Sequence, residues 1–202
     1  MHRPLSTLRA PLAFPGQTIG LFGGSFDPPH AGHVHVAETA MKRLRLDQVW
    51  WLVSPQNPLK GTPGAFAERR AAVEAIVPGP RHKVTDIESQ LSVRYTAQLI
   101  EALLKRYPHV TFVWLMGADN LASFHRWQNW RGIMSAMLVA VIARPGSGLK
   151  ALNGPAASAF SFAQIPETKA ATLARRRPPA WVFLNARLNP LSSTALRARI
   201  NR

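Results

Sequence analysis

Short apolar runs alternate along the chain with segments whose apolar residues have helical spacing. Residues 18–22 (TIGLF) are mostly apolar and precede two glycines, which predicts a buried strand that ends in a turn. Between residues 36 and 46 the apolar positions recur at i, i+3, i+4 and i+7, which is typical of one helix face. By the same reasoning we expect further strands at residues 49–53, 82–87, 110–116, 137–142 and 181–184, and further helices at 66–77, 96–107 and 192–202.

Strands that are apolar throughout and separated by helices predict a parallel sheet covered on both faces. We therefore expect an α/β fold with a doubly wound, mainly parallel sheet of five to six strands and helices on both faces. Between residues 145 and 179, Gly, Pro, Ala and Ser predict loops and at most one short helix. Residues 1–17 contain three prolines and predict a flexible N-terminal extension, which leaves residues 18–202 as a single domain.

Composition and charge limit the kinds of protein that fit. The 202 residues include no cysteine, which excludes disulfides, thiolate metal sites and a cysteine nucleophile. No apolar run approaches the roughly 18 residues that span a membrane, and the N-terminal residues lack the apolar centre of a secretory signal. The net charge is +15, from 25 Lys and Arg against 10 Asp and Glu. This charge suits either a nucleic-acid-binding module or a basic enzyme with a polyanionic small substrate, and composition leaves both open.

The densest candidate site is residues 23–33 (GGSFDPPHAGH), between the first predicted strand and the first predicted helix. Glycines there allow backbone N–H groups to approach a phosphate, and a helix N-terminus favours an anion. His30 and His33 stand at the helix entrance, where their imidazole N–H groups can bridge phosphate oxygens. Two alternatives stay open. One is a metal site of His30, His33 and His35, which lacks an HExxH pairing and a nearby carboxylate ligand; the other is a turn with incidental histidines.

Weaker candidates lie elsewhere along the chain. Residues 192–197 (SSTALR) fit an ordinary helix cap, or a second phosphate site that includes Arg197. Asp119 follows a strand and can either contact a ribose or base or cap the next helix. Trp127 fits a core residue or, because its neighbours are polar, a ring-stacking surface. Lys60 is either a solvated loop lysine or a ligand of a triphosphate.

Together these segments resemble the HxGH nucleotidylyltransferase superfamily, and within it the bacterial nicotinate-nucleotide adenylyltransferases. The resemblance rests on residues 23–33, 57–60, 95–97, 117–119 with Trp127, 143–146 and 192–197, which occur in the family's order. It implies a Rossmann-like fold and an enzyme that joins the AMP moiety of ATP to nicotinate mononucleotide. The products would be deamido-NAD and pyrophosphate, in NAD biosynthesis.

The resemblance also implies how the reaction proceeds and where. The mononucleotide phosphate attacks the α-phosphate of ATP in line, with Mg²⁺ and without a covalent enzyme intermediate. The partners implied are ATP and nicotinate mononucleotide, with neither nucleic acid nor a membrane, in the cytoplasm. A homo-oligomer stays open.

Individual residues take roles only through their match to the family's motifs. The catalytic positions are His30, His33, Lys60 and Arg197. Thr96 and Trp127 match the residues that lie near the nicotinate carboxylate and stack on the nicotinate ring. The remaining nucleotide-binding positions are Gly23, Gly24, Ser25, Phe26, Gly117, Asp119, Arg144, Ser193 and Thr194. No residue is assigned to a metal.

Two positions depart from the family's pattern. Leu59 stands where many relatives carry His, which leaves Lys60 as the main cation of that loop, and Gln98 stands where an acidic residue is frequent. The nearest rival enzymes are other members of the superfamily, such as phosphopantetheine adenylyltransferases. Trp127 and the chain length favour a pyridine nucleotide. The preference for the acid over the amide mononucleotide rests on the resemblance around Thr96 and Trp127.

Overall fold

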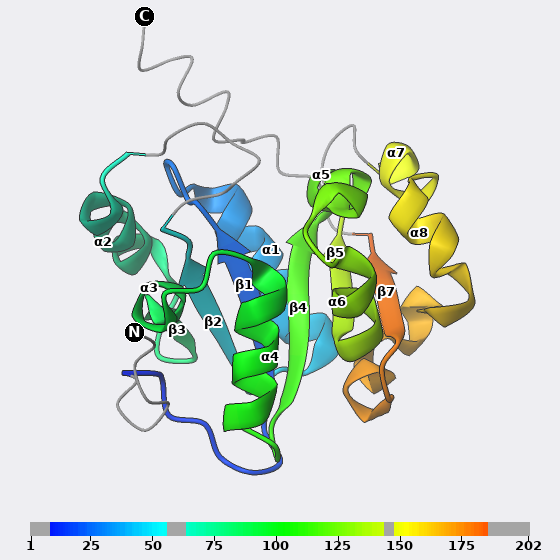
Figure 1. Cartoon of the computed structure of the whole chain (residues 1–202), viewed down its shortest axis with the longest axis horizontal. Helices are drawn as coiled ribbons and strands as arrows, with labels where there is room; N and C mark the ends of the chain where they lie inside the picture. The colour runs from blue at the N-terminus through cyan, green and yellow to red at the C-terminus, as the bar shows by residue number, and fades with distance from the viewer. Residues whose placement is uncertain (1–8, 56–63, 144–147, 186–202) are drawn as a thin grey trace, which may run out of the picture.

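The protein folds around one parallel sheet with helices on both faces (Figure 1). The computed structural model describes residues 9–55, 64–143 and 148–185. Seven strands lie in the order β3-β2-β1-β4-β5-β7-β6, and every neighbouring pair is parallel. The strands are β1 (Thr18–Gly24), β2 (Gln48–Val53), β3 (His82–Thr85), β4 (Thr111–Gly117), β5 (Leu138–Ile142), β6 (Gln164–Ile165) and β7 (Ala180–Leu184).

The helices form two layers, one on each face of the sheet. One core cluster joins the sheet to α1 (Ala31–Leu44), α2 (Phe66–Ile76) and the 3₁₀ helix η4 (Glu167–Arg175). The opposite cluster joins it to α3 (Ile87–Leu91), α4 (Thr96–Arg106), α5 (Ala118–Ser123), η2 (Phe124–Arg126), α6 (Trp130–Ala136), α7 (Gly148–Leu152), α8 (Pro155–Ala159) and η3 (Ser161–Ala163). Helices α4, α5 and α6 cover the face that Figure 1 turns toward the viewer.

Burial on both faces explains why the central strands carry no polar side chain after their first residue. Trp50 and Trp51 are consecutive residues of β2, and both are fully buried. Because successive side chains of a strand point to opposite faces, Trp50 joins the α4 side of the core and Trp51 joins the α1 side. The predicted α/β class and the doubly wound parallel sheet are confirmed.

The strand count, one strand boundary and the region from 145 to 179 differ from the prediction. The sheet has seven strands rather than five to six, because the two-residue β6 pairs with the edge of β7 without forming an apolar run. The strand predicted at 82–87 ends at Thr85, whose side chain accepts a hydrogen bond from the N–H of Ile87 as α3 begins. The region from 145 to 179 holds α7, α8, η3 and η4, which are too short or irregular to leave a clear periodicity.

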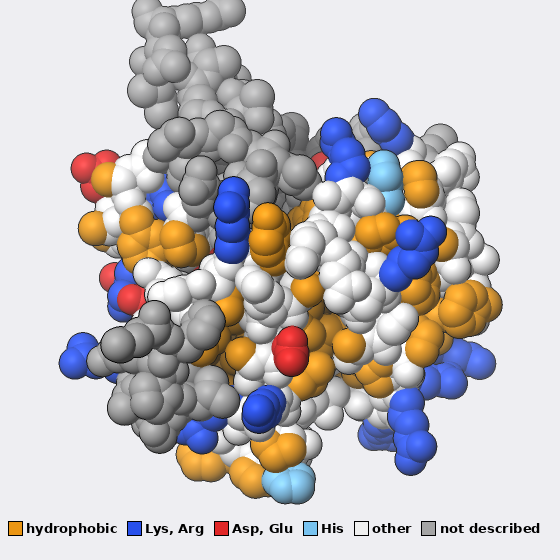
Figure 2. All heavy atoms as spheres, in the orientation of Figure 1, with side chains coloured by type: hydrophobic (Ala, Val, Ile, Leu, Met, Phe, Trp, Pro, Cys, Tyr) orange, Lys and Arg blue, Asp and Glu red, His pale blue; other side chains and the backbone are white. Residues whose placement is uncertain are grey.

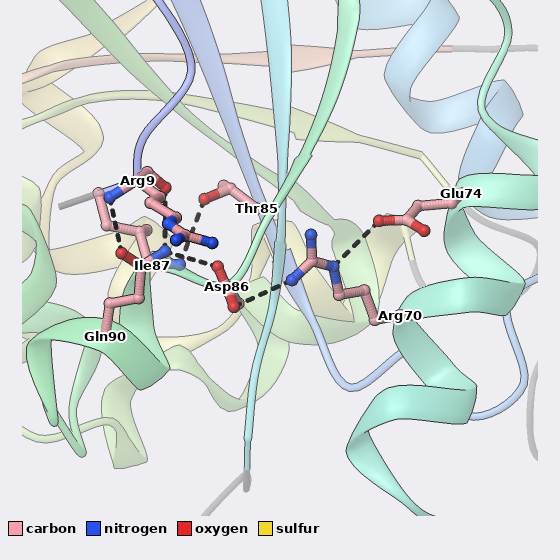
Figure 3. A network of polar contacts seen from close by, with 7 residues as sticks. All are labelled: Arg9, Arg70, Glu74, Thr85, Asp86, Ile87 and Gln90. Atoms are coloured by element: carbon pink, nitrogen blue, oxygen red, sulfur yellow. Dashed lines mark hydrogen bonds and ion pairs between the residues drawn. The ribbon is translucent and has the colours of Figure 1, made fainter.

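The described part of the N-terminal segment, residues 9–17, crosses below the amino ends of the strands (Figure 1). The N–H of Arg9 donates to Oε1 of Gln90 at 2.7 Å, and Nε2 of Gln90 donates back to the carbonyl of Arg9 at 2.9 Å (Figure 3). Farther along, the N–H of Gly16 donates to the carbonyl of His109 at 2.8 Å. The second half of the extension thus makes specific backbone contacts with the domain. Among the described residues, none of the helices has the length and hydropathy that a bilayer crossing needs.

Gly23 gives the first prediction, because a Cβ at this position would lie 2.8 Å from Cη2 of the buried Trp114. Gly23→Ala should therefore lower the free energy of unfolding by about 1–3 kcal/mol, the usual cost of overpacking a core. Urea unfolding followed by tryptophan fluorescence measures it. Gly64→Ala is the control, since the nearest atom to its Cβ would be 3.5 Å away, and it should stay within about 0.5 kcal/mol. Equal urea midpoints for both variants would contradict this packing.

Candidate active site

The carboxyl ends of the central strands lie level with one another. Gly24 at the end of β1 is paired with Val53 of β2, and Gly117 at the end of β4 is paired with Ile142 of β5. The chain runs from β1 outward to β3 and then returns to β4 on the other side of β1. This reversal makes the β1–β4 boundary the switch point, where doubly wound sheets bind their ligands. Two candidate segments from the sequence, residues 23–33 and 117–119, begin there.

The two histidines lie together at the start of α1. His30 is the N-cap residue and is only 6% exposed, and its ring centroid lies 3.9 Å from that of His33. The N–H of Gly32 donates to Nδ1 of His30 at 3.1 Å. The N–H of His30 donates to Nδ1 of His33 at 3.2 Å. The helix start is therefore capped by two imidazoles in place of the usual hydroxyl or carboxylate side chains.

These contacts decide where each ring carries its proton. A neutral imidazole has one donor nitrogen and one acceptor nitrogen, so a ring that accepts at Nδ1 carries its proton on Nε2. Both His30 and His33 therefore present Nε2–H as a donor. Because the N–H of Gly32 is already used by His30, the donors that the helix start adds to its dipole are imidazole N–H groups, of which Nε2 of His30 is buried.

The sequence assigned the two glycines to close approach of a phosphate, and that role stays a prediction. In the structure they also admit aromatic rings. A Cβ at Gly24 would lie 3.1 Å from the ring of Phe26, and Gly23 lies against Trp114. Phe26 is 2% exposed, has a positive φ of 48°, and its ring meets His33 edge-on at 5.1 Å. The turn is thus set by packing beneath it, which also supports His33.

Trp114 links this turn to the third candidate segment. Its ring lies beside Gly23 and stands edge-on to Trp127, with centroids 6.3 Å apart at 84°. Trp127 also packs against Phe124 at 5.0 Å and is only partly buried. Asp119 lies exposed in the first turn of α5, just beyond β4. Trp127 is therefore neither a fully buried core residue nor a loose surface residue, which suits a ring-stacking role.

Thr96 is the first residue of α4, on the same side of the sheet as Trp127. Oε1 of Gln98 accepts hydrogen bonds from the N–H groups of Arg94 and Tyr95, both at 3.2 Å. Gln98 therefore caps the helix start as an acidic residue would, and its departure from the family's pattern leaves the backbone at Thr96 supported.

Buried polar side chains behind the turn were missed by the sequence analysis. Arg69 of α2 is only 4% exposed and donates to four backbone carbonyls, among them those of Ser25 and Ser54. Burial lowers its pKa, while the nearby Asp27 acts in the opposite direction. The signal was present in the sequence, because Arg69 shares the inward face of the helix with Val73 at i+4.

His82 anchors α1 from behind. Nε1 of Trp51 donates to Nδ1 of His82 at 3.0 Å, so the proton on Nε2 points to Glu38 of α1 at 2.7 Å. Burial lowers the pKa of His82, and the hydrogen bond to Glu38 opposes that shift.

Glu88 lies on the other side of the end of β2. The hydroxyl of Ser54 donates to Oε2 of Glu88 at 2.5 Å, while the N–H of Ser54 donates to the carbonyl of Gly24 at 2.9 Å. Burial raises the pKa of Glu88 to about 7, against the smaller opposing effect of the Ser54 hydrogen bond. A carboxyl that titrates near neutral pH thus lies two contacts away from the glycine turn.

Five predicted site residues lie outside the described part of the chain: Lys60, Arg144, Ser193, Thr194 and Arg197. Within the described ranges, no group of three or more His, Cys, Asp or Glu side chains is arranged to hold a metal ion.

Comparisons with the sequences and structures of known proteins show which family the chain belongs to. The cytidylyltransferase-like family model matches residues 21–199. A protein of Cereibacter sphaeroides described as a probable nicotinate-nucleotide adenylyltransferase is 57% identical over 181 residues, which are 89% of this chain and 96% of that protein. A Ruegeria protein with the same description is 54% identical over 90% of this chain and 97% of its own length. The chain belongs to the nicotinate-nucleotide adenylyltransferase family.

The fold extends to more distant relatives. The Plasmodium falciparum nicotinic acid mononucleotide adenylyltransferase, solved in complex with NaAD, aligns with a TM-score of 0.68 over 90% of this chain and 83% of that one. Sequence identity across this alignment is 18%, so the likeness concerns the architecture alone.

The raised pKa of Glu88 predicts how the stability of this fold depends on pH. Because its pKa is raised from 4.5 to about 7 on folding, the stability that protonation contributes is complete below pH 4.5 and is lost as the pH rises through 7. Glu88→Gln should remove this loss. As the pH rises from about 5 to about 8, the free energy of unfolding of the variant should therefore increase relative to that of wild type by on the order of 1–3 kcal/mol. Urea midpoints at both pH values measure it, with Glu101→Gln on the exposed side of α4 as the control. Parallel pH profiles for wild type and Glu88→Gln would contradict the assignment.

Proposed function

We propose that this chain transfers the adenylyl group of ATP to nicotinate mononucleotide and releases deamido-NAD and pyrophosphate. The observation that carries the proposal is the pair of Nε2–H donors of His30 and His33 beside the β1–β4 switch point. Identity above 50% over most of the chain to relatives with that description supports the same reaction.

The chemistry follows from fixed donors facing a polyanion. A phosphate oxygen of the mononucleotide bonds to the α-phosphorus of ATP, while the bond from that phosphorus to the β-phosphate bridging oxygen breaks and pyrophosphate leaves. The imidazoles of His30 and His33 stabilise the charge that develops on the α-phosphate oxygens, and their fixed rings need little reorganisation. No side chain forms a covalent bond to the nucleotide in this scheme.

The mononucleotide is proposed to bind on the other side of the switch point. Trp127 offers a half-buried ring for stacking on the pyridine, and Thr96 offers the start of α4 for its carboxylate. Gly117 and Asp119, at the end of β4, are proposed to line the adenosine site, and Ser25 and Phe26 lie in the turn close to the phosphates.

For the residues outside the described ranges, the proposal keeps the roles implied by the family's motifs. Lys60 and Arg197 would bind phosphates, Arg144 would lie near the nucleotide, and Ser193 and Thr194 would form a second phosphate clamp.

Magnesium is proposed to enter with ATP. Mg²⁺ keeps several waters and is commonly held by substrate phosphates with one or two carboxylates, so it does not require a cage of three protein ligands. The donor set in the described residues fits this mode, because Asp27 is a carboxylate in the turn that follows β1, three residues before His30. When bound, the ion would neutralise part of the triphosphate charge, while His30 and His33 donate to the oxygens that remain.

The net charge of +15 favours a second candidate, a nucleic-acid-binding module. On the face in Figure 2, Lys and Arg side chains are scattered, with one group at the lower right, and they form no continuous stripe. This distribution and the histidine pair support the enzyme, with the positive charge suited to two polyanionic nucleotides. We propose that neither nucleic acid nor a membrane is a partner; a cytoplasmic location stays a prediction, and a homo-oligomer is left open.

The test is release of pyrophosphate from ATP with a panel of mononucleotides. We expect turnover with nicotinate mononucleotide, slower turnover with nicotinamide mononucleotide, and none with phosphopantetheine. Equal rates with the acid and the amide would refute the stated preference. Tight binding of duplex DNA at physiological salt, without pyrophosphate release, would favour the second candidate.

His33 gives the mutational prediction. His33→Ala should lower kcat by about 10²–10³, the usual loss when one donor to a developing oxyanion is removed. The control is His35→Ala, which shortens a histidine of the same helix to which the proposed reaction gives no role, and this variant should keep most of the activity. Both rates are measured per folded enzyme. A near-wild-type kcat for His33→Ala would refute its role, and an equal loss at His35 would revive a metal site.

A further inference from the structure

Arg69 is a buried cation that the reaction scheme does not use. Its side chain is 4% exposed, while the neighbouring Arg70 reaches the surface and pairs with Glu74 and Asp86, each at 3.0 Å (Figure 3). Within the described residues, every hydrogen-bond acceptor of Arg69 is a backbone carbonyl. Among residues 9–55, 64–143 and 148–185 no ion pair to Arg69 is found, although Asp27 is near enough to oppose the lowering of its pKa. Burying a guanidinium is costly unless its donors are satisfied, so the four carbonyls stabilise Arg69 at this position.

The guanidinium holds three chain segments at the carboxyl edge of the sheet. Nη1 donates to the carbonyl of Ser25 at 2.6 Å and to that of Ser54 at 2.9 Å. Nη2 donates to the carbonyl of Pro55 at 3.1 Å, and Nε donates to that of Gly64 at 2.9 Å. Ser25 belongs to the turn after β1, and Ser54 and Pro55 follow β2. Pro55 and Gly64 are the residues on either side of 56–63, the stretch of sequence that contains Lys60.

Two more contacts tie the same segments together. The N–H of Gly64 donates to Oδ2 of Asp27 at 3.3 Å, and the N–H of Ser54 donates to the carbonyl of Gly24 at 2.9 Å. Asp27 lies only three residues before His30. A shift of the Ser25 carbonyl would therefore be passed through a short, closely packed turn to the histidine pair.

We propose that Arg69 is a positioning residue for adenylyl transfer, which fixes the turn carrying His30 and His33 relative to both ends of the 56–63 segment. Its planar, forked donors make this possible, because one guanidinium can serve four carbonyls from three directions. A lysine carries the same charge but has three donors on one atom and cannot span these acceptors. We call the guanidinium of Arg69 with its four carbonyl acceptors the Arg69 clamp. The inference rests on the proposed function for the reaction, but the Arg69 clamp itself rests on the contacts above.

The experiment compares Arg69→Lys, Arg69→Gln and Arg69→Met with Arg70→Met, which removes a cation from the next residue of the same helix. Two readouts are normalised to folded enzyme. The first is steady-state kinetics with whichever mononucleotide the wild type uses. The second is calorimetric binding of α,β-methylene-ATP, which needs no acceptor, so a wrong acceptor assignment does not affect it.

We expect kcat per folded Arg69 variant to fall on the order of 10–100-fold, as small misplacements of reacting groups do. The analogue should bind more weakly, and the KM for the mononucleotide should stay within about twofold, because Trp127 and Thr96 lie outside the Arg69 clamp. Arg70→Met should match wild type in all three. Wild-type kcat and analogue affinity in any folded Arg69 variant would overturn the proposal. Failure of all three variants to fold, with Arg70→Met folded, would also overturn it, since Arg69 would then serve the fold alone. A wild type that is inactive with every mononucleotide but binds the analogue, with weaker binding in the Arg69 variants, would refute the proposed function but not the positioning role of Arg69.

Discussion

Two hydrogen bonds from backbone N–H groups to imidazole nitrogens, at the start of α1, determine which donors this site presents. They run from the N–H groups of Gly32 and His30 to Nδ1 of His30 and His33, so the path of the backbone fixes both ring orientation and proton position. That path depends on Phe26, whose buried ring lies beneath the turn, and on Arg69, which holds the carbonyl of Ser25. The proposed donors are therefore oriented before any nucleotide binds, so they need little reorganisation to stabilise a transition state.

The buried residues beneath the turn affect the charge at the candidate site as well as the position of the turn. Arg69 places a positive charge behind the carboxyl ends of β1 and β2, where a negatively charged triphosphate is expected. Glu88 lies close by, through Ser54, and a carboxylate there would repel phosphates. The burial that raises its pKa to about 7 also lowers its mean negative charge near neutral pH. Both groups are buried enough for their effect on a bound anion to be larger than in water.

The sequence predicted the central strands well because burial on both faces makes them apolar after their first residue, as in β2 and β4. It did not predict β6, because two residues paired at a sheet edge leave no periodic signal. It extended β3 by two residues, because the strand ends where the N–H of Ile87 donates to the hydroxyl of Thr85 as α3 begins. Hydrogen bonding between distant segments decides such ends, and local pattern does not carry it.

The candidate site likewise contains residues that the sequence analysis singled out and residues that it missed. His30 and His33 were proposed from residue type and spacing, and the structure brings their rings together at the start of α1. Arg69 was missed, because a lone arginine in a helix is usually solvated and only the fold reveals its four carbonyl partners. The predicted reason for Gly23 and Gly24 was also incomplete, since the rings that they admit come from Trp114 and Phe26.

Nitrogen-15 NMR can identify the proton positions at the start of α1, because long-range proton–nitrogen spectra distinguish the two tautomers of each histidine. We expect His30 and His33 both to carry their proton on Nε2 at neutral pH. Both Nε2 signals should shift when α,β-methylene-ATP is added, while Nδ1 of each ring keeps the signal of an acceptor nitrogen. A proton on Nδ1 of either ring, or Nε2 signals that do not change with the nucleotide, would show that these imidazoles are not the donors to the phosphates.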